Sequence, residues 1–208
     1  HLARLHAQWA PSDPEAIVQL ADVQGANHNY RSAAQNYRQF LRLRPDDMSV
    51  RLRYAQLLND MGAHRELTTQ LVHIARQAKD PMHIMEVGRR AIRLPGVDML
   101  ATITDALLDL ALQRPRRTIY REVLVETYSR WIQRTNLLGR NEAQNQWLEQ
   151  NTEQGLRPIA EALTSQNMAA RSHALNILHS TRPKAAEPAL TMLLREHDRV
   201  TQFQALVG

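Results

Sequence analysis

Apolar residues between positions 30 and 43 recur every three or four residues, and this spacing predicts one helix with a wide apolar stripe. The stripe consists of Tyr30, Ala33, Ala34, Tyr37, Phe40, Leu41 and Leu43. Pro45 ends this helix because its ring cannot continue the hydrogen-bond ladder, and Asp46 or Asp47 can cap the helix that follows. Such a helix cannot bury its apolar face alone, so other helices of the chain must cover it.

The segments on either side repeat this design at an interval of about 34 residues, a length typical of helical-hairpin repeats. One helix begins at Pro14 and another is capped by Asp47, and Gly62 ends the latter as a left-handed C-terminal residue. Four pairs of equivalent positions share this interval: Ala21 and Ala55, Ala33 and Leu67, Tyr37 and Leu71, and Phe40 and Ile74. The pairs predict two consecutive helical hairpins of one repeat type.

The best-defined residues of the first hairpin and its successor are Leu20, Ala21, Tyr30, Ala33, Tyr37, Leu41, Pro45, Leu58 and Gly62. At this spacing they resemble the tetratricopeptide repeat, and the resemblance covers residues 14–80. Phe40 and Leu67 stand where that family usually has small residues. Gln24 stands where an aromatic residue is common, and Arg51 replaces a large apolar residue. We expect looser or altered packing at the departures in the second repeat.

Beyond residue 80 the helical pattern continues without the motif. Further helices are expected over residues 82–94, 98–112 and 118–138, with Pro95, Pro115 and Gly139 as breakers. From 155 to 197 the chain is similar to HEAT repeats, in which a proline-containing first helix precedes a second helix with an arginine, here Arg171. Three pairs share a second, shorter interval of about 30 residues there: Leu156 and Ala186, Pro158 and Pro188, and Leu163 and Leu193.

The predicted fold class is therefore all-α. The two resemblances imply a right-handed α-solenoid of antiparallel helical hairpins, with a tetratricopeptide-like array over residues 1–140 and HEAT-like repeats over 141–208 packed continuously on it. Composition agrees, because good helix formers dominate and only 5% of residues are aromatic. The sequence begins at His1, without a methionine, so we expect a piece of a larger multi-repeat protein.

Candidate chemistry is sparse. The chain has no cysteine, its nine histidines are scattered, and it contains no Gly-rich phosphate loop, zinc-binding His pair or nucleophile elbow. We expect no enzyme activity, no metal site and no cofactor. No apolar run is long enough to span a membrane. The sequence does not decide between the periplasm and the cytoplasm.

The positive charge of the chain suggests a second hypothesis, in which the protein binds nucleic acid. The net charge is +5, and only Lys79 and Lys184 are lysines among 26 basic residues. Arginine grips phosphate in a bidentate way, although coding bias also explains the excess. The densest basic patch is Arg114, Arg116, Arg117 and Arg121, with Arg130 and Arg134 further along the same helix. Glu122 and Glu126 interrupt it, which favours a protein partner over nucleic acid.

The tetratricopeptide resemblance implies that the first helix of each hairpin lines a concave surface where a partner peptide lies. Transferred position by position, the predicted partner-binding residues are Glu15, Asp22, Gln56, Asn59, His83, Glu86, Arg90 and Arg93. The alternative is that these are solvated residues of amphipathic helices. The function expected is a non-catalytic scaffold that binds another protein or a neighbouring domain of its own polypeptide. A bacterial envelope assembly, such as exopolysaccharide export, and a cytoplasmic adaptor both fit this expectation.

Overall fold

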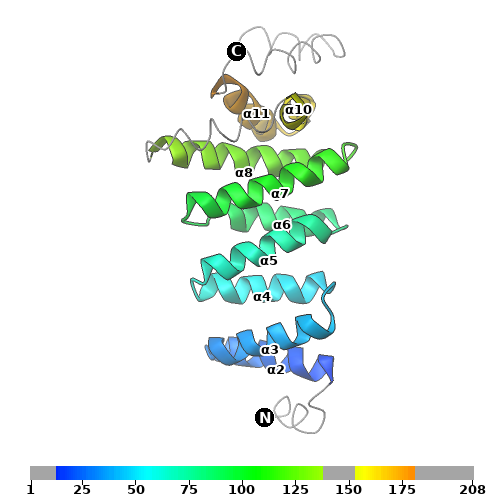
Figure 1. Cartoon of the computed structure of the whole chain (residues 1–208), viewed down its shortest axis with the longest axis vertical. Helices are drawn as coiled ribbons and strands as arrows, with labels where there is room; N and C mark the ends of the chain where they lie inside the picture. Colours follow the sequence, from blue (N-terminus) through cyan, green and yellow to red (C-terminus); the bar gives the residue numbers. More distant parts are fainter. Residues whose placement is uncertain (1–12, 138–152, 181–208) are drawn as a thin grey trace. The chain divides into compact units, whose positions relative to one another are not determined.

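A computed structural model describes residues 13–137 and 153–180, and within these ranges the protein is entirely helical (Figure 1). Nine α-helices and one 3₁₀ turn occupy the described residues, with no strand among them. The all-α prediction is thus confirmed. Contacts divide the chain into two compact units, residues 1–79 and residues 80–208.

The helices of the first unit are α2 (Pro14–Ala26), α3 (Tyr30–Leu43), α4 (Met48–Asp60) and α5 (His64–Gln77). Each helix packs on the next one along the chain. The bounds of α4 and α5 follow the bounds of α2 and α3 by one constant interval, at every start and every end. This interval equals the one between equivalent apolar positions, so the period of the sequence is also a period of the backbone.

Helix ends explain how the backbone keeps this period. Asp13 caps α2 by accepting a hydrogen bond from the Glu15 amide at 3.0 Å, and Asp47 caps α4 through the Val50 amide at 2.9 Å. After these helices, His28 and Gly62 both adopt positive φ, 58° and 68°. The two aspartate caps are one repeat interval apart, and so are the two left-handed residues. Each hairpin therefore begins with an aspartate cap and reverses its direction through one left-handed residue.

Arg51, one of the departures from the family pattern, is almost fully buried, with 7% of its surface exposed. Its guanidinium donates to Gln70 Oε1 on α5 and to the carbonyl oxygen of Pro45, each at 2.6 Å. Burial lowers the pKa of this group. Arg51 is therefore a buried residue of α4 that links this helix to α5 and to the turn before α4. Leu67, the other departure in this hairpin, is fully buried.

The helices of the second unit are α6 (Pro81–Ala91), α7 (Val97–Gln113), α8 (Thr118–Leu137), α10 (Glu153–Glu161) and α11 (Met168–Ser180), with a 3₁₀ turn, η1 (Ala162–Thr164), between the last two. Helix α8 contacts α6, α7, α10 and α11, and α10 also contacts α7. The buried rings of Tyr128 and Trp131 stack at 5.4 Å in α8. Helix α8 is thus the central element of this unit.

Helices α6 and α8 approach each other closely at Gly88. A Cβ atom added to Gly88 would lie 2.7 Å from Cγ1 of Val123, closer than carbon atoms pack. Gly88 and Val123 are both buried. The missing side chain at Gly88 is therefore what allows α8 to lie directly against α6.

Two predictions fall partly outside the described residues. The domain boundary predicted at residue 140 lies in the segment 138–152, and the HEAT-like partners Ala186, Pro188 and Leu193 lie beyond residue 180. Pro158 is in the interior of α10, as the sequence predicts for the first helix of that pair. Across the described ranges, no helix has both the length and the apolarity to cross a bilayer.

Candidate binding groove

Two adjoining cavities open along one side of α8, between α6 and α11. Cavity A has a volume of about 260 Å³ and cavity B about 360 Å³. Glu126 and His173 line both of them, so the cavities meet at these two residues. We call the pair the α8 groove. Its other lining residues are Met85, Arg89, Ile119, Glu122, Val123, Asn167, Ala169 and Ala170 in cavity A, and Ile92, Arg93, Ser129, Arg130 and Gln133 in cavity B.

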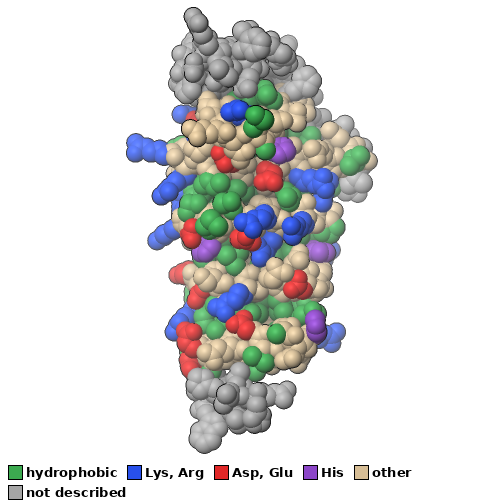
Figure 2. Space-filling model, turned by 180° about the vertical axis from the view of Figure 1, so that it is seen from behind, with side chains coloured by type: hydrophobic (Ala, Val, Ile, Leu, Met, Phe, Trp, Pro, Cys, Tyr) green, Lys and Arg blue, Asp and Glu red, His purple; other side chains and the backbone are tan. Residues whose placement is uncertain are grey.

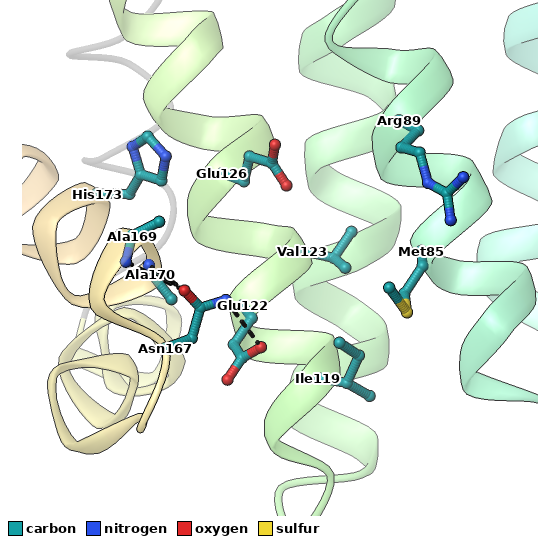
Figure 3. A pocket seen from close by; sticks show the side chains of 10 residues that line it. All are labelled: Met85, Arg89, Ile119, Glu122, Val123, Glu126, Asn167, Ala169, Ala170 and His173. Atoms are coloured by element: carbon teal, nitrogen blue, oxygen red, sulfur yellow. Dashed lines mark hydrogen bonds between the residues drawn. The ribbon is translucent and has the colours of Figure 1, made fainter.

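Cavity A has an apolar floor. Ile119 and Val123 lie one turn apart on α8 and face Met85 of α6, while Ala169 and Ala170 of α11 close the opposite side (Figure 3). Ile119 and Met85 are partly exposed. An apolar side chain from a ligand would remove this surface from water, which is the main source of affinity at such a site.

The wall formed by α11 is fixed to α8 through Glu122. Its carboxylate accepts a short hydrogen bond from the hydroxyl of Ser165 and a longer one, 3.4 Å, from Nδ2 of Asn167. Asn167 in turn accepts a hydrogen bond from the Ala169 amide at 3.1 Å, at the start of α11. Arg171 donates to the carbonyl oxygen of Ser165 at 2.9 Å. Glu122 and Arg171 therefore hold the turn before α11 in place.

The two cavities meet at His173 of α11 and Glu126 of α8, which line both of them (Figure 3). His173 Nδ1 lies 3.1 Å from Oγ of Ser129, a residue that is only 3% exposed. Glu126 is exposed, and its carboxylate has no hydrogen-bond or ion-pair partner among the described residues. The junction thus combines an anchored imidazole with a carboxylate that is available to a ligand.

Cavity B is basic. Arg93 and Arg130 are exposed, and neither forms an ion pair with any carboxylate in the described ranges. Arg130 makes one long hydrogen bond, 3.4 Å, to Gln133. Next to them, Arg134 donates to the carbonyl oxygen of Ile92 at 3.1 Å, and burial together with the charge of Arg130 lowers its pKa.

Of the predicted partner-binding residues on α6 and just beyond its end, only Arg93 lines the groove. Glu86 forms ion pairs with Arg89 at 2.8 Å and with Arg90, whose side chain is 16% exposed. His83 is half-buried. The charges of Glu86 and Arg90 are thus used within α6 and are not presented to a partner.

The four predicted residues of the first unit lie on α2 and α4, and most have partners inside that unit. Glu15 pairs with Arg44 at 2.7 Å, and Asp22 pairs with Arg53 at 2.6 Å and accepts the hydroxyl hydrogen of Tyr37. Gln56 donates to Asp60 at 2.7 Å, and Asn59 is half-buried.

The predicted basic patch is divided in the structure. Arg121 pairs with Glu161 at 2.7 Å and donates to the carbonyl of Pro115, whereas Arg114 lies over the ring of Tyr120 at 5.9 Å. Arg116 and Arg117 are exposed on the turn between α7 and α8. On the face drawn in Figure 2, basic and acidic side chains are interspersed with hydrophobic ones.

Sequence reasoning missed several groove residues, chiefly Arg89, Ser129 and His173. Glu126 and Arg130 were noted only as part of a mixed charge pattern on one helix. A spacing of four placed these two residues on one face of α8, but nothing in the sequence placed His173 beside them. Among the described residues no group of histidine and carboxylate side chains is arranged to hold a metal ion.

Comparison with known proteins gives no family assignment, because no family model matches the chain and no curated protein is significantly similar to it.

Proposed function

We propose that this protein is a non-catalytic helical-repeat scaffold that binds a segment of another protein in the α8 groove. The observation that carries the proposal is the groove itself, two adjoining cavities with an apolar floor and charges of both signs at the rim. Protein-binding sites commonly combine an apolar centre with a polar, solvent-accessible border. Helix-in-groove and extended-peptide recognition both use such surfaces.

The finer architecture belongs to the same proposal. We assign the first unit to tetratricopeptide-like hairpins and the end of the described chain to a HEAT-like pair, joined in a right-handed α-solenoid. Support comes from the recurrence of all four helix bounds at the repeat interval in the first unit and from Pro158 in the first helix of the later pair. A solenoid stacks each repeat on its neighbours and leaves one long face for partners.

Protein binding is favoured over nucleic-acid binding because arginines of the predicted basic patch already have partners within the protein. Phosphate contacts need several uncompensated cations along one surface, but in the predicted basic patch Arg121 pairs with Glu161 and Arg114 lies over the ring of Tyr120. The groove also contains Glu126, which repels a phosphate backbone. A larger bacterial assembly, such as an envelope or exopolysaccharide export complex, is the biological setting we propose, on the repeat resemblance alone.

Site-specific photo-crosslinking tests the function. A photoreactive amino acid is placed at Gln133, an exposed residue of cavity B, and, as a matched control, at Asp109, an exposed residue of α7 outside the groove. In source cells that express the full protein, we expect an adduct with a second protein from Gln133 and none from Asp109. Equal adducts from both positions, or none from Gln133, would refute the proposal.

A further inference from the structure

Three charged side chains in the α8 groove pair with no oppositely charged group among the described residues. They are Glu126 on α8, Arg130 one turn further along α8, and Arg93 just beyond the end of α6. Glu126 and Arg130 are one helical turn apart and could pair with each other on the helix surface, yet Arg130 contacts Gln133 instead. All three charges are therefore available to a ligand.

The other charges of the groove are already used. Glu122 holds Ser165 and Asn167, and Arg89 pairs with Glu86. What cavity A offers a ligand is consequently its apolar floor, and what cavity B offers is two guanidinium groups. Along α8, from its N-terminal end onward, the groove presents an apolar surface at Ile119 and Val123, then a negative charge, then positive charges.

We infer that the partner is a peptide segment of a second protein whose side chains run apolar, basic, acidic in the direction of α8. The acidic side chain binds Arg93 and Arg130 in cavity B, the basic side chain lies over Glu126, and the apolar side chain fills cavity A. Guanidinium groups bind carboxylates through paired hydrogen bonds. This inference rests on the proposed function, because it specifies the chemistry of the partner for the same groove.

The order of charges along the α8 groove favours a peptide over other ligands that contain a carboxylate or a phosphate. A nucleic-acid strand presents one sign of charge at every position and meets repulsion from Glu126. A peptide can alternate sign within one turn of helix, about 5.4 Å, which matches the spacing of Glu126 and Arg130 on α8. Charges at the rim of an interface mainly determine which partner binds and how fast, so they define specificity more than affinity.

Selection from a displayed library of random peptides, each about 16 residues or four turns of helix, provides the probe. The full protein is the target. Peptides that also bind the variant Ala169→Trp are discarded, because this exposed residue lines cavity A and a large side chain there fills it. Circular dichroism confirms that the variant keeps its helices. The remaining peptides depend on the groove.

The charge test compares two double variants of equal charge change. Arg93→Glu with Arg130→Glu reverses cavity B, while Arg116→Glu with Arg117→Glu reverses two exposed arginines on the turn between α7 and α8. We expect a selected peptide to bind the first variant at least about 10-fold more weakly and the second within about twofold, at one ionic strength. Replacing the acidic residue of the peptide with Lys should restore binding to the first variant.

The outcomes separate the inference from the proposed function. Groove-dependent peptides without the apolar, basic, acidic order overturn the inference and leave the groove as a protein-binding site. Equal weakening of peptide binding by both double variants also overturns the inference, because it shows an effect of the overall charge of the protein and not of cavity B. Failure to select any groove-dependent peptide overturns both proposals.

Discussion

Substitution of Gly88 by Ala tests the close contact between α6 and α8, on which the groove depends. Ala is the better helix former by about 1 kcal/mol, so an exposed glycine in this helix would gain stability from the change. At Gly88 the new Cβ would meet Cγ1 of Val123 at 2.7 Å. Ordinary carbon contacts need at least about 3.5 Å, and the β-branched Val123 has one strongly preferred rotamer in a helix, so the helices must separate.

Overpacking of this kind costs about 1–3 kcal/mol. When the gain in helix propensity is subtracted from this cost, Gly88→Ala should destabilise the second unit by roughly 1 kcal/mol. Urea denaturation followed by circular dichroism measures the change, and hydrogen exchange of α6 and α8 locates it. Gly25→Ala is the matched control, because its Cβ would meet only the flexible tip of Leu57, at 3.2 Å.

The double variant with Val123→Ala sharpens the test. Val123→Ala alone should cost roughly 1.5–2 kcal/mol, because it removes two buried methyl groups. In the double variant the methyl group introduced at position 88 occupies the space that Val123 vacates, so the combined cost should be smaller than the sum by about 1–2 kcal/mol. Stabilisation by Gly88→Ala alone, or additive costs in the double variant, would show that α6 and α8 do not touch there.

Three further predictions concern stability in each unit. His28→Gly should stabilise the first unit by up to about 1 kcal/mol in thermal or urea unfolding, because the positive φ of 58° strains any residue with a Cβ; a loss would show that the 2.7 Å contact between His28 and Tyr30 outweighs this strain. Glu66→Gln should destabilise the first unit at neutral pH. Hydrogen bonds from Arg38, and then from Tyr54, lower the pKa of the Glu66 carboxyl below its usual 4.5. The stabilisation is therefore present above about pH 4.5 and is lost as the pH falls through the lower folded-state pKa, so a wild-type advantage that stays constant down to pH 2 would contradict this assignment. Glu122→Ala should raise amide exchange in α11 and cost about 1–3 kcal/mol, whereas Glu126→Ala, the matched change at an unpartnered carboxylate one turn away, should leave α11 protected.

The helical hairpins of the first unit could be predicted from the sequence because their signals are local. Apolar spacing gave the buried faces, aspartates at positions 13 and 47 gave the starts, and the breakers gave the ends, so most bounds agree within a residue or two. The role of Arg51 could not be predicted in this way. Its acceptors, Gln70 and the Pro45 carbonyl, are identified only when α4 and α5 are packed together.

The candidate site was less predictable for the same physical reason. The binding positions transferred from the tetratricopeptide repeat included Arg93. They also included Glu86 and Arg90, which pair with each other on α6. Whether a surface charge is free depends on what lies within a few ångströms of it, and that distance is a property of packing. Glu122 illustrates the point, because its partners Ser165 and Asn167 belong to the turn before α11, a different and distant part of the chain.

The sequence by itself therefore determined that the chain is helical, where the helices of the first unit begin and end, and that these hairpins repeat at a constant interval. The helix faces and helix ends follow from interactions over one or two turns, and the repeat is a recurrence of those local signals. Only the tertiary structure decided that α6 and α11 flank α8, that Gly88 permits the close contact, and that Glu126, Arg130 and Arg93 share one groove. The helical period determines which face of a helix is buried, but it does not specify which other helix covers that face.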